Sequence, residues 1–200
     1  MNNIYNYIWK EEHWLPENYT WKDFATQNNA PTGMDLVYPI FPVAVSLIFL
    51  RSFVERYYLK PLGKRWGVGR TKLNKFSDSG WRFICYCSLW TFGFLVLVQK
   101  PWFSNSHYFW KDFPLQGIDN DVWWYYTLVV GYYWSLVINQ FSEGRRKDFW
   151  MMFAHHVITL SLLCFSWMIN ITRIGSMFNL IHDIADVPLE EISKDTKIFL

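Results

Sequence analysis

Four long apolar stretches decide what this chain can fold into. Each holds about 20 residues with few charges, the length of helix that crosses a bilayer. They lie at about 36–53, 81–98, 122–141 and 149–169, and a weaker fifth begins near Ile174. We therefore expect an all-α fold, a polytopic transmembrane helical bundle with about five spans.

The composition favours the same class of protein. Aromatic residues make up 21% of the chain and charged residues only 18%, whereas soluble domains carry roughly 25% charge. Trp and Tyr are typical of membrane interfaces. Cys85, Cys87 and Cys164 all lie in apolar segments, so we interpret them as core residues and not as a disulfide framework.

Charges between the spans predict an orientation. Basic residues collect on the cytosolic side of membrane proteins. The segment 54–80 is rich in them: Arg56, Lys60, Lys64, Arg65, Arg70, Lys72 and Lys75. Residues 1–35 carry more acidic than basic side chains. We therefore expect a luminal segment at 1–35, a first transmembrane helix at 36–53 and a basic cytosolic loop at 54–80.

Two further observations bear on this topology. "NYT" at Asn18–Thr20 is a glycosylation acceptor that only the lumen can use, so Asn18 is a candidate site. "NIT" at Asn170–Thr172 lies against the membrane face, and we expect it to be unused. The basic loop could also form a nucleic-acid patch, but a loop beside anionic lipid explains it more simply, and we expect no nucleic-acid partner.

Ionisable residues inside the spans are the main candidates for function. His155 and His156 lie in the fourth span, and His182, Asp183 and Asp186 lie in the fifth. Such groups are costly, at about 2.5–3.5 kcal/mol for Asp at the centre of a membrane. At 1.5 Å per residue, His155 lies about 9 Å and Asp186 about 12 Å below the cytosolic face, with His182 nearer mid-membrane.

This polar set fits proton-transfer chemistry. A neutral imidazole can take a proton from an amine or can accept an acyl group, and a carboxylate can orient the ring. Two alternatives remain: interhelical hydrogen bonds without catalysis, or a zinc site built from His155 or His156, His182 and an Asp. Because no motif such as H-E-x-x-H determines a ligand geometry, we expect no metal.

The same segment resembles a known family. "RRKDFWMMFAHHVITLSLLCFSWMINITRIGSMFNLIHDIADVPLE", residues 145–190, resembles the signature motif of the ceramide synthases within the TLC domain. The similarity includes "RKDF", the histidine pair, "N-x-x-R-x-G" at Asn170–Gly175 and "HDxxD" at His182–Asp186. The flanking "KFSDSGWRF", "KPWF" and "YYWSL" agree.

The resemblance implies an endoplasmic reticulum membrane protein with a luminal N-terminus. It implies acyl transfer from acyl-coenzyme A, as co-substrate and without a further cofactor, to the amine of a sphingoid base, giving (dihydro)ceramide. Membrane lipid surrounds such enzymes, and homo- or hetero-dimers with other synthases are expected partners. By this resemblance the candidate catalytic residues are His155, His156, His182, Asp183 and Asp186. The basic residues Arg145, Arg146 and Lys147 are candidates for the coenzyme A phosphates.

Three departures from the family pattern qualify this expectation. The loop 54–80 is too short for the homeobox-like domain of many animal members. Pro188 is expected to disturb the last helix. After a partial TLC domain at 81–190, the tail 191–200 diverges where the family continues through further spans. We therefore expect a C-terminally truncated member, and the alternative function is an inactive TLC membrane protein that senses lipid or pairs with a full-length synthase.

Overall fold

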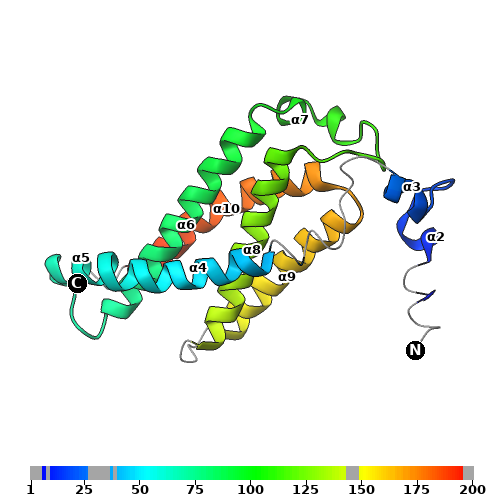
Figure 1. The fold of residues 1–200 in the computed structure, drawn as a ribbon. Helices are drawn as coiled ribbons and strands as arrows, with labels where there is room; N and C mark the ends of the chain where they lie inside the picture. The colour runs from blue at the N-terminus through cyan, green and yellow to red at the C-terminus, as the bar shows by residue number, and fades with distance from the viewer. Residues whose placement is uncertain (1–5, 8–9, 27–36, 38–39, 143–148, 196–200) are drawn as a thin grey trace.

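The structure is a computed structural model that describes residues 6–7, 10–26, 37, 40–142 and 149–195. Side chains are described in these ranges except at 24–26, 142 and 185–195. Every regular element in this part of the chain is a helix. The all-α fold class predicted from the apolar stretches is therefore confirmed for the described residues (Figure 1).

Five long helices match the five expected stretches. They are α4 (Ile40–Val54), α6 (Leu73–Leu97), α8 (Asn120–Ser142), α9 (Phe149–Met168) and α10 (Thr172–Asp195). Within the described ranges, α6 and α9 are the helices long and apolar enough to cross a membrane. The count of five spans stays a prediction.

Short elements connect the long helices. The N-terminal region contains α2 (Glu11–Trp14) and α3 (Trp21–Thr26), and Trp14 contacts Phe165 of α9 at 5.6 Å between ring centroids. The π-helix η2 (Glu55–Leu59) and α5 (Lys60–Arg65) follow α4, whereas α7 (Pro101–Ser104) and the 3₁₀-helix η3 (Ser106–Phe109) follow α6.

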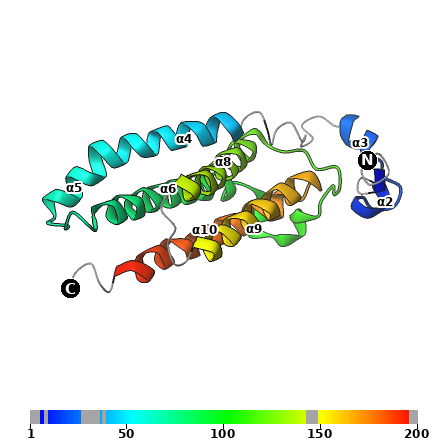
Figure 2. The same cartoon turned by 90° about the horizontal axis from the view of Figure 1, so that it is seen from below.

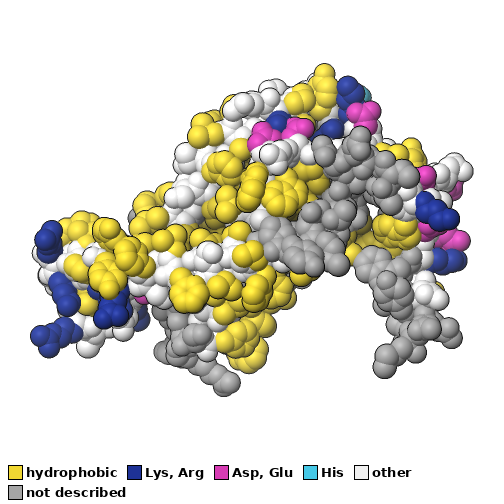
Figure 3. Space-filling model, viewed as in Figure 1, with side chains coloured by type: hydrophobic (Ala, Val, Ile, Leu, Met, Phe, Trp, Pro, Cys, Tyr) yellow, Lys and Arg dark blue, Asp and Glu magenta, His cyan; other side chains and the backbone are white. Residues whose placement is uncertain are grey.

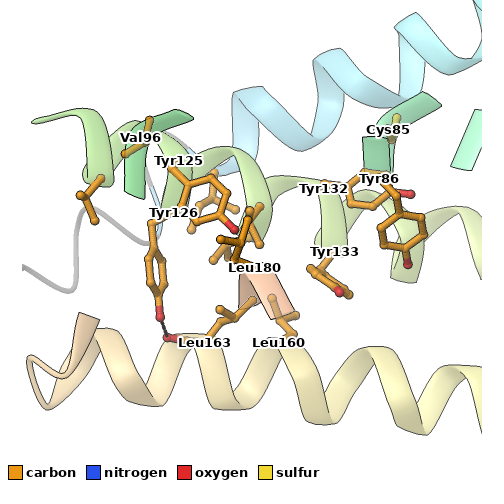
Figure 4. Close-up of a cluster of buried hydrophobic side chains, with 14 of the residues drawn as sticks. Cys85, Tyr86, Val96, Tyr125, Tyr126, Tyr132, Tyr133, Leu160, Leu163 and Leu180 are labelled. Carbon is orange, nitrogen blue, oxygen red and sulfur yellow. Dashed lines mark hydrogen bonds between the residues drawn. The ribbon is translucent and has the colours of Figure 1, made fainter. Parts of the chain in front are cut away.

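The central helix of the bundle is α8. It packs against α4, α6 and α9, and α10 packs against α6 and α9. Figure 2 shows α4 on one side of α6 and α8, with α9 and α10 on the other. Tyrosines occupy α8 in two pairs seven residues apart, at Tyr125–Tyr126 and Tyr132–Tyr133. A spacing of seven returns to the same helix face, so each pair presents one ring to α6 and one to the α9 side (Figure 4).

Helix covers much of the segment expected as the basic loop 54–80. The chain is helical through Arg65 and again from Leu73. The two parts pack tightly at Gly63, where a Cβ would lie 2.8 Å from both Leu73 and Phe76. A glycine therefore allows α5 to fold back onto α6. The cations face outward at this end of the molecule, and apolar side chains cover the neighbouring flank (Figure 3).

A capped turn at Asn170 joins α9 to α10. Asn170 has φ 57°, the left-handed conformation that ends many helices at glycine or asparagine. The Ile171 amide donates to the Ser166 carbonyl at 2.8 Å, and the Asn170 amide donates to the Trp167 carbonyl at 3.1 Å. These two bonds form a Schellman motif. Because the turn is short, α10 starts at once and returns along α9.

The Asn170 side chain also holds the loop between α6 and α8. Its amide Nδ2 donates to the carbonyls of Pro114 at 2.7 Å and Gln116 at 2.9 Å. Arg173 donates to the carbonyl of Tyr108 at 2.8 Å, and its guanidinium lies 4.9 Å from the centre of the Trp102 ring. Asn170 is fully buried, which fits the prediction that "NIT" is not glycosylated.

The glycine of "N-x-x-R-x-G" permits a close approach between helices. A Cβ on Gly175 would lie 2.5 Å from both the Ser166 and the Tyr126 hydroxyl oxygens. Those hydroxyls are hydrogen bonded to each other, and Tyr126 also donates to the Leu163 carbonyl at 3.2 Å. The three specified residues of this motif therefore have structural roles in this chain. Asn170 forms the turn, Arg173 binds the loop between α6 and α8, and Gly175 allows the close contact between helices.

An ion cluster between the end of α6 and the start of α8 ties the two helices together. The Lys100 ammonium lies 2.7 Å from Asp119 and 2.9 Å from Asp121. Partial burial acts to lower the pKa of Lys100, but its hydrogen bonds to the two carboxylates outweigh that effect and raise the pKa above its usual value.

The expected disturbance at Pro188 is not observed, since α10 continues through it to Asp195.

Candidate active site

The histidines of the fourth and fifth stretches meet between α9 and α10. The rings of His155 and His182 stack at 5.2 Å between centroids, with 17° between their planes. The ring of His156 lies 5.5 Å from that of His155. The juxtaposition of these two separate motifs, predicted from helix depth, is present in the structure.

The residue of α10 whose ring contacts His155 is His182. The depth estimate placed Asp186 level with the histidine pair and His182 nearer mid-membrane. In the structure the ring of His182 lies against that of His155, and α10 starts at Thr172, two residues before the expected Ile174. The side chain of Asp186 lies outside the described residues.

Asp183 is the buried carboxylate of this site. Its side chain is 1% exposed, so its charge depends on hydrogen bonds. The Tyr133 hydroxyl donates to Oδ1 at 3.0 Å, and Asn179 Nδ2 donates to Oδ2 at 2.8 Å. The same amide donates to the Tyr125 hydroxyl at 3.0 Å. Two helices therefore hold the carboxylate in a single orientation beside His182.

The histidines differ in exposure. His156 is 5% exposed and its ring lies 6.2 Å from that of Tyr133, so it points into the bundle. His155 is half-buried, and the His182 side chain is 22% exposed. The neighbouring Phe178 is exposed on the same side of α10. The stacked pair is thus the part of the site that a substrate can reach.

Chemically, the site combines two accessible imidazoles with one buried carboxylate. Imidazoles can exchange protons or accept an acyl group near neutral pH. The Nδ1 atom of His182 lies 4.0 Å from Asp183 Oδ1, close enough for the carboxylate to stabilise a positive charge on the ring. Within the described ranges, no group of three or more His, Cys, Asp or Glu side chains is placed to hold a metal ion.

The remaining candidates lie elsewhere. Arg145, Arg146 and Lys147 are outside the described residues. Asn18 is exposed, in a turn between α2 and α3. His107 is exposed in η3, away from the stacked pair.

Sequence reasoning missed two parts of the site and one ion network. The two missed parts are Tyr133 and Asn179, which carry no charge. For Tyr133, the seven-residue spacing between the tyrosine pairs of α8 was a signal in the sequence. Asp78 falls in the segment 54–80 that was expected as a basic loop, but it lies in α6 and is 3% exposed. It accepts hydrogen bonds from Arg51 at 3.0 Å and from Arg82 at 2.8 Å.

Comparison with known proteins determines the family. A model of the TLC domain matches residues 75–193, more than half of the chain. The chain belongs to the TLC-domain family. Its membrane-type domain and its two sufficiently long apolar helices make it a membrane protein.

The most similar relatives include several ceramide synthases. Ceramide synthase 5 of Homo sapiens is 28% identical over 94% of this chain and 62% of its own length. The ceramide synthase hyl-1 of Caenorhabditis elegans is 32% identical over 92% of this chain and 55% of its own length. Ceramide synthase 5 of Mus musculus is 28% identical over 96% of this chain and 60% of its own length.

This TLC-domain protein is thus similar to ceramide synthases over more than nine tenths of its length. The family resemblance expected from the motif is therefore confirmed. The chain spans between 55% and 62% of the length of these three relatives.

Proposed function

We propose that this chain is a sphingoid base N-acyltransferase that makes (dihydro)ceramide from acyl-coenzyme A and a sphingoid base. The observation that carries the proposal is the stack of His155 on His182 at 5.2 Å, next to the buried carboxylate of Asp183. The relatives named ceramide synthase support the product class.

The first step is acyl transfer to the protein. An imidazole nitrogen of His155 attacks the thioester carbonyl, and the carbon–sulfur bond breaks. The imidazole N–H proton passes to the sulfur, so that coenzyme A leaves as the thiol. His155 is favoured over His156 because His155 is half-buried on the accessible side of the stack, whereas His156 points toward Tyr133.

The second step forms the amide. The amine of the sphingoid base attacks the acyl carbon, and the bond from that carbon to the His155 nitrogen breaks. His182 takes the amine proton and returns it to His155, which restores both rings. Asp183 stabilises the transient positive charge on His182 from 4.0 Å.

The setting of this reaction follows the same proposal. The chain lies in the endoplasmic reticulum membrane with its N-terminus in the lumen, where Asn18 is available for glycosylation. Arg145, Arg146 and Lys147 follow α8 and precede α9 in the sequence, and they are proposed to meet the coenzyme A phosphates. Membrane lipid surrounds the bundle, and a second synthase chain is the proposed protein partner. Acyl-coenzyme A is a co-substrate, and no further cofactor takes part.

The test of this function uses microsomes from cells that lack their own ceramide synthases and express this chain. Sphinganine and a panel of acyl-coenzyme A lengths are supplied, and dihydroceramide is measured by mass spectrometry. We expect product above the level of vector-only microsomes, with a preference among chain lengths. A stable, inserted chain that makes no product contradicts the proposal and favours a non-catalytic TLC protein.

A further inference from the structure

Tyr133 of α8 lies at the centre of the candidate site. Its side chain is fully buried, and its hydroxyl donates to Asp183 Oδ1 at 3.0 Å. The same oxygen lies 3.5 Å from Nδ1 of His182, at the outer limit of a hydrogen bond. One phenol oxygen therefore faces both the carboxylate and the imidazole.

We propose that Tyr133 is a positioning residue that holds the proton of His182 on Nδ1 and leaves Nε2 as the basic nitrogen. The inference rests on the proposed function for its catalytic consequence, but not for its structural content. It assigns a role to a residue outside the histidine and aspartate motifs.

The argument begins from the single proton of the phenol. A tyrosine hydroxyl can donate only one hydrogen bond, and here the carboxylate of Asp183 receives it. Toward His182 the phenol oxygen can then act only as an acceptor. A second acceptor near Nδ1 is the carboxylate oxygen Oδ1 of Asp183, at 4.0 Å. Two acceptors facing one ring nitrogen favour the tautomer with hydrogen on that nitrogen.

The second oxygen of Asp183 makes this arrangement rigid. Asn179 donates to Oδ2 at 2.8 Å and to the Tyr125 hydroxyl at 3.0 Å. With both oxygens engaged, the carboxylate cannot turn freely toward His182. The hydroxyl of Tyr133 is thus the nearest of these acceptors to Nδ1 and the group that couples the ring to Asp183. The Nε2 lone pair then suits the proton transfer assigned to His182.

The next residue provides a matched control. Tyr132 is also buried, at 1% exposure, and its ring packs edge-on against Tyr86 at 5.4 Å. Its hydroxyl has no hydrogen-bond partner in the described part of the chain. Tyr132→Phe and Tyr133→Phe therefore remove the same atom from adjacent buried rings, but only the second change touches the site.

The structural test is ¹⁵N NMR of the full chain with labelled histidine in detergent micelles at about pH 8, where an ordinary imidazole is neutral. The His182 signals are identified by their loss in His182→Gln. We expect the Nδ1–H tautomer in the wild type and in Tyr132→Phe, and a mixture of tautomers in Tyr133→Phe. An Nε2–H tautomer in the wild type, or identical spectra for the two Phe variants, overturns the proposal.

The kinetic test asks whether this positioning matters for acyl transfer. Tyr133→Phe is expected to lower kcat about 10-fold, the usual scale for a residue that orients another ligand or base, with KM changed less than about twofold. Tyr132→Phe should keep both constants near wild-type values. An unchanged kcat in Tyr133→Phe overturns the catalytic part. If the wild type itself makes no product, the proposed function fails, and the NMR spectra alone decide the role of Tyr133.

Discussion

His155→Ala is expected to lower the rate of N-acylation by at least about 100-fold, because it removes the group proposed to attack the thioester. The side chain is half-buried, so the variant should still insert and fold. Rates are compared per molecule of folded chain in microsomes, with dihydroceramide as the product.

Two other histidines show whether the loss is specific. His107 is exposed in η3, and His107→Ala should keep the rate within about twofold of the wild type, as expected for a surface change. His156 is buried against Tyr133, so His156→Ala should mainly reduce the amount of folded chain. The N-acylation rate per folded molecule should fall less. Activity that survives His155→Ala, with His156→Ala as the inactive variant, would reverse the assignment.

Asp78→Ala is expected to cause the largest loss of stability, about 3–5 kcal/mol in the free energy of unfolding. Asp78 is 3% exposed and joins Arg51 of α4 to Arg82 of α6, at 3.0 and 2.8 Å. Arg51 also binds Glu55 at 2.6 Å. Without the carboxylate, the buried guanidinium of Arg51 and the partly buried guanidinium of Arg82 lose their shared counter-charge, and the contact between α4 and α6 weakens.

The control for Asp78→Ala is an exposed carboxylate that also pairs with a cation. The Asp119 side chain is 55% exposed and binds Lys100 at 2.7 Å, so Asp119→Ala should cost less than about 1 kcal/mol. Thermal unfolding in detergent measures both variants. We expect the melting temperature to fall by roughly 10 °C for Asp78→Ala and by little for Asp119→Ala. Equal shifts would show that the buried network contributes no more than a surface ion pair.

The helices and the histidine site were predictable because membrane-length apolar runs and intramembrane charges are strong signals. Apolar length predicted five helical stretches, and the depths estimated for His155 and Asp186 predicted that two motifs would meet. The same simple depth rule placed Asp186, not His182, level with the pair. The left-handed turn at Asn170 starts α10 at Thr172, two residues before the expected Ile174, and an average rise per residue contains no such turn.

Other features could not be predicted because they depend on packing between helices. The segment after Val54 has the charge of a loop, but η2 and α5 form there, and Gly63 allows α5 to make close contact with Leu73 and Phe76. Tyr133 is one of several tyrosines in α8. Only its contacts with His156 of α9 and Asp183 of α10 distinguish it from Tyr132, which faces Tyr86 of α6.

The most direct test of the central claim is to trap the acyl group on the protein. The full chain is incubated with acyl-coenzyme A without sphingoid base, digested, and analysed by mass spectrometry, with His155→Ala as the control. We predict an added acyl mass on the peptide that contains His155, absent in the variant and discharged to dihydroceramide when sphinganine is added. Product formation without any acylated His155, or an acyl group on His156 or a cysteine that transfers to sphinganine, would contradict the account.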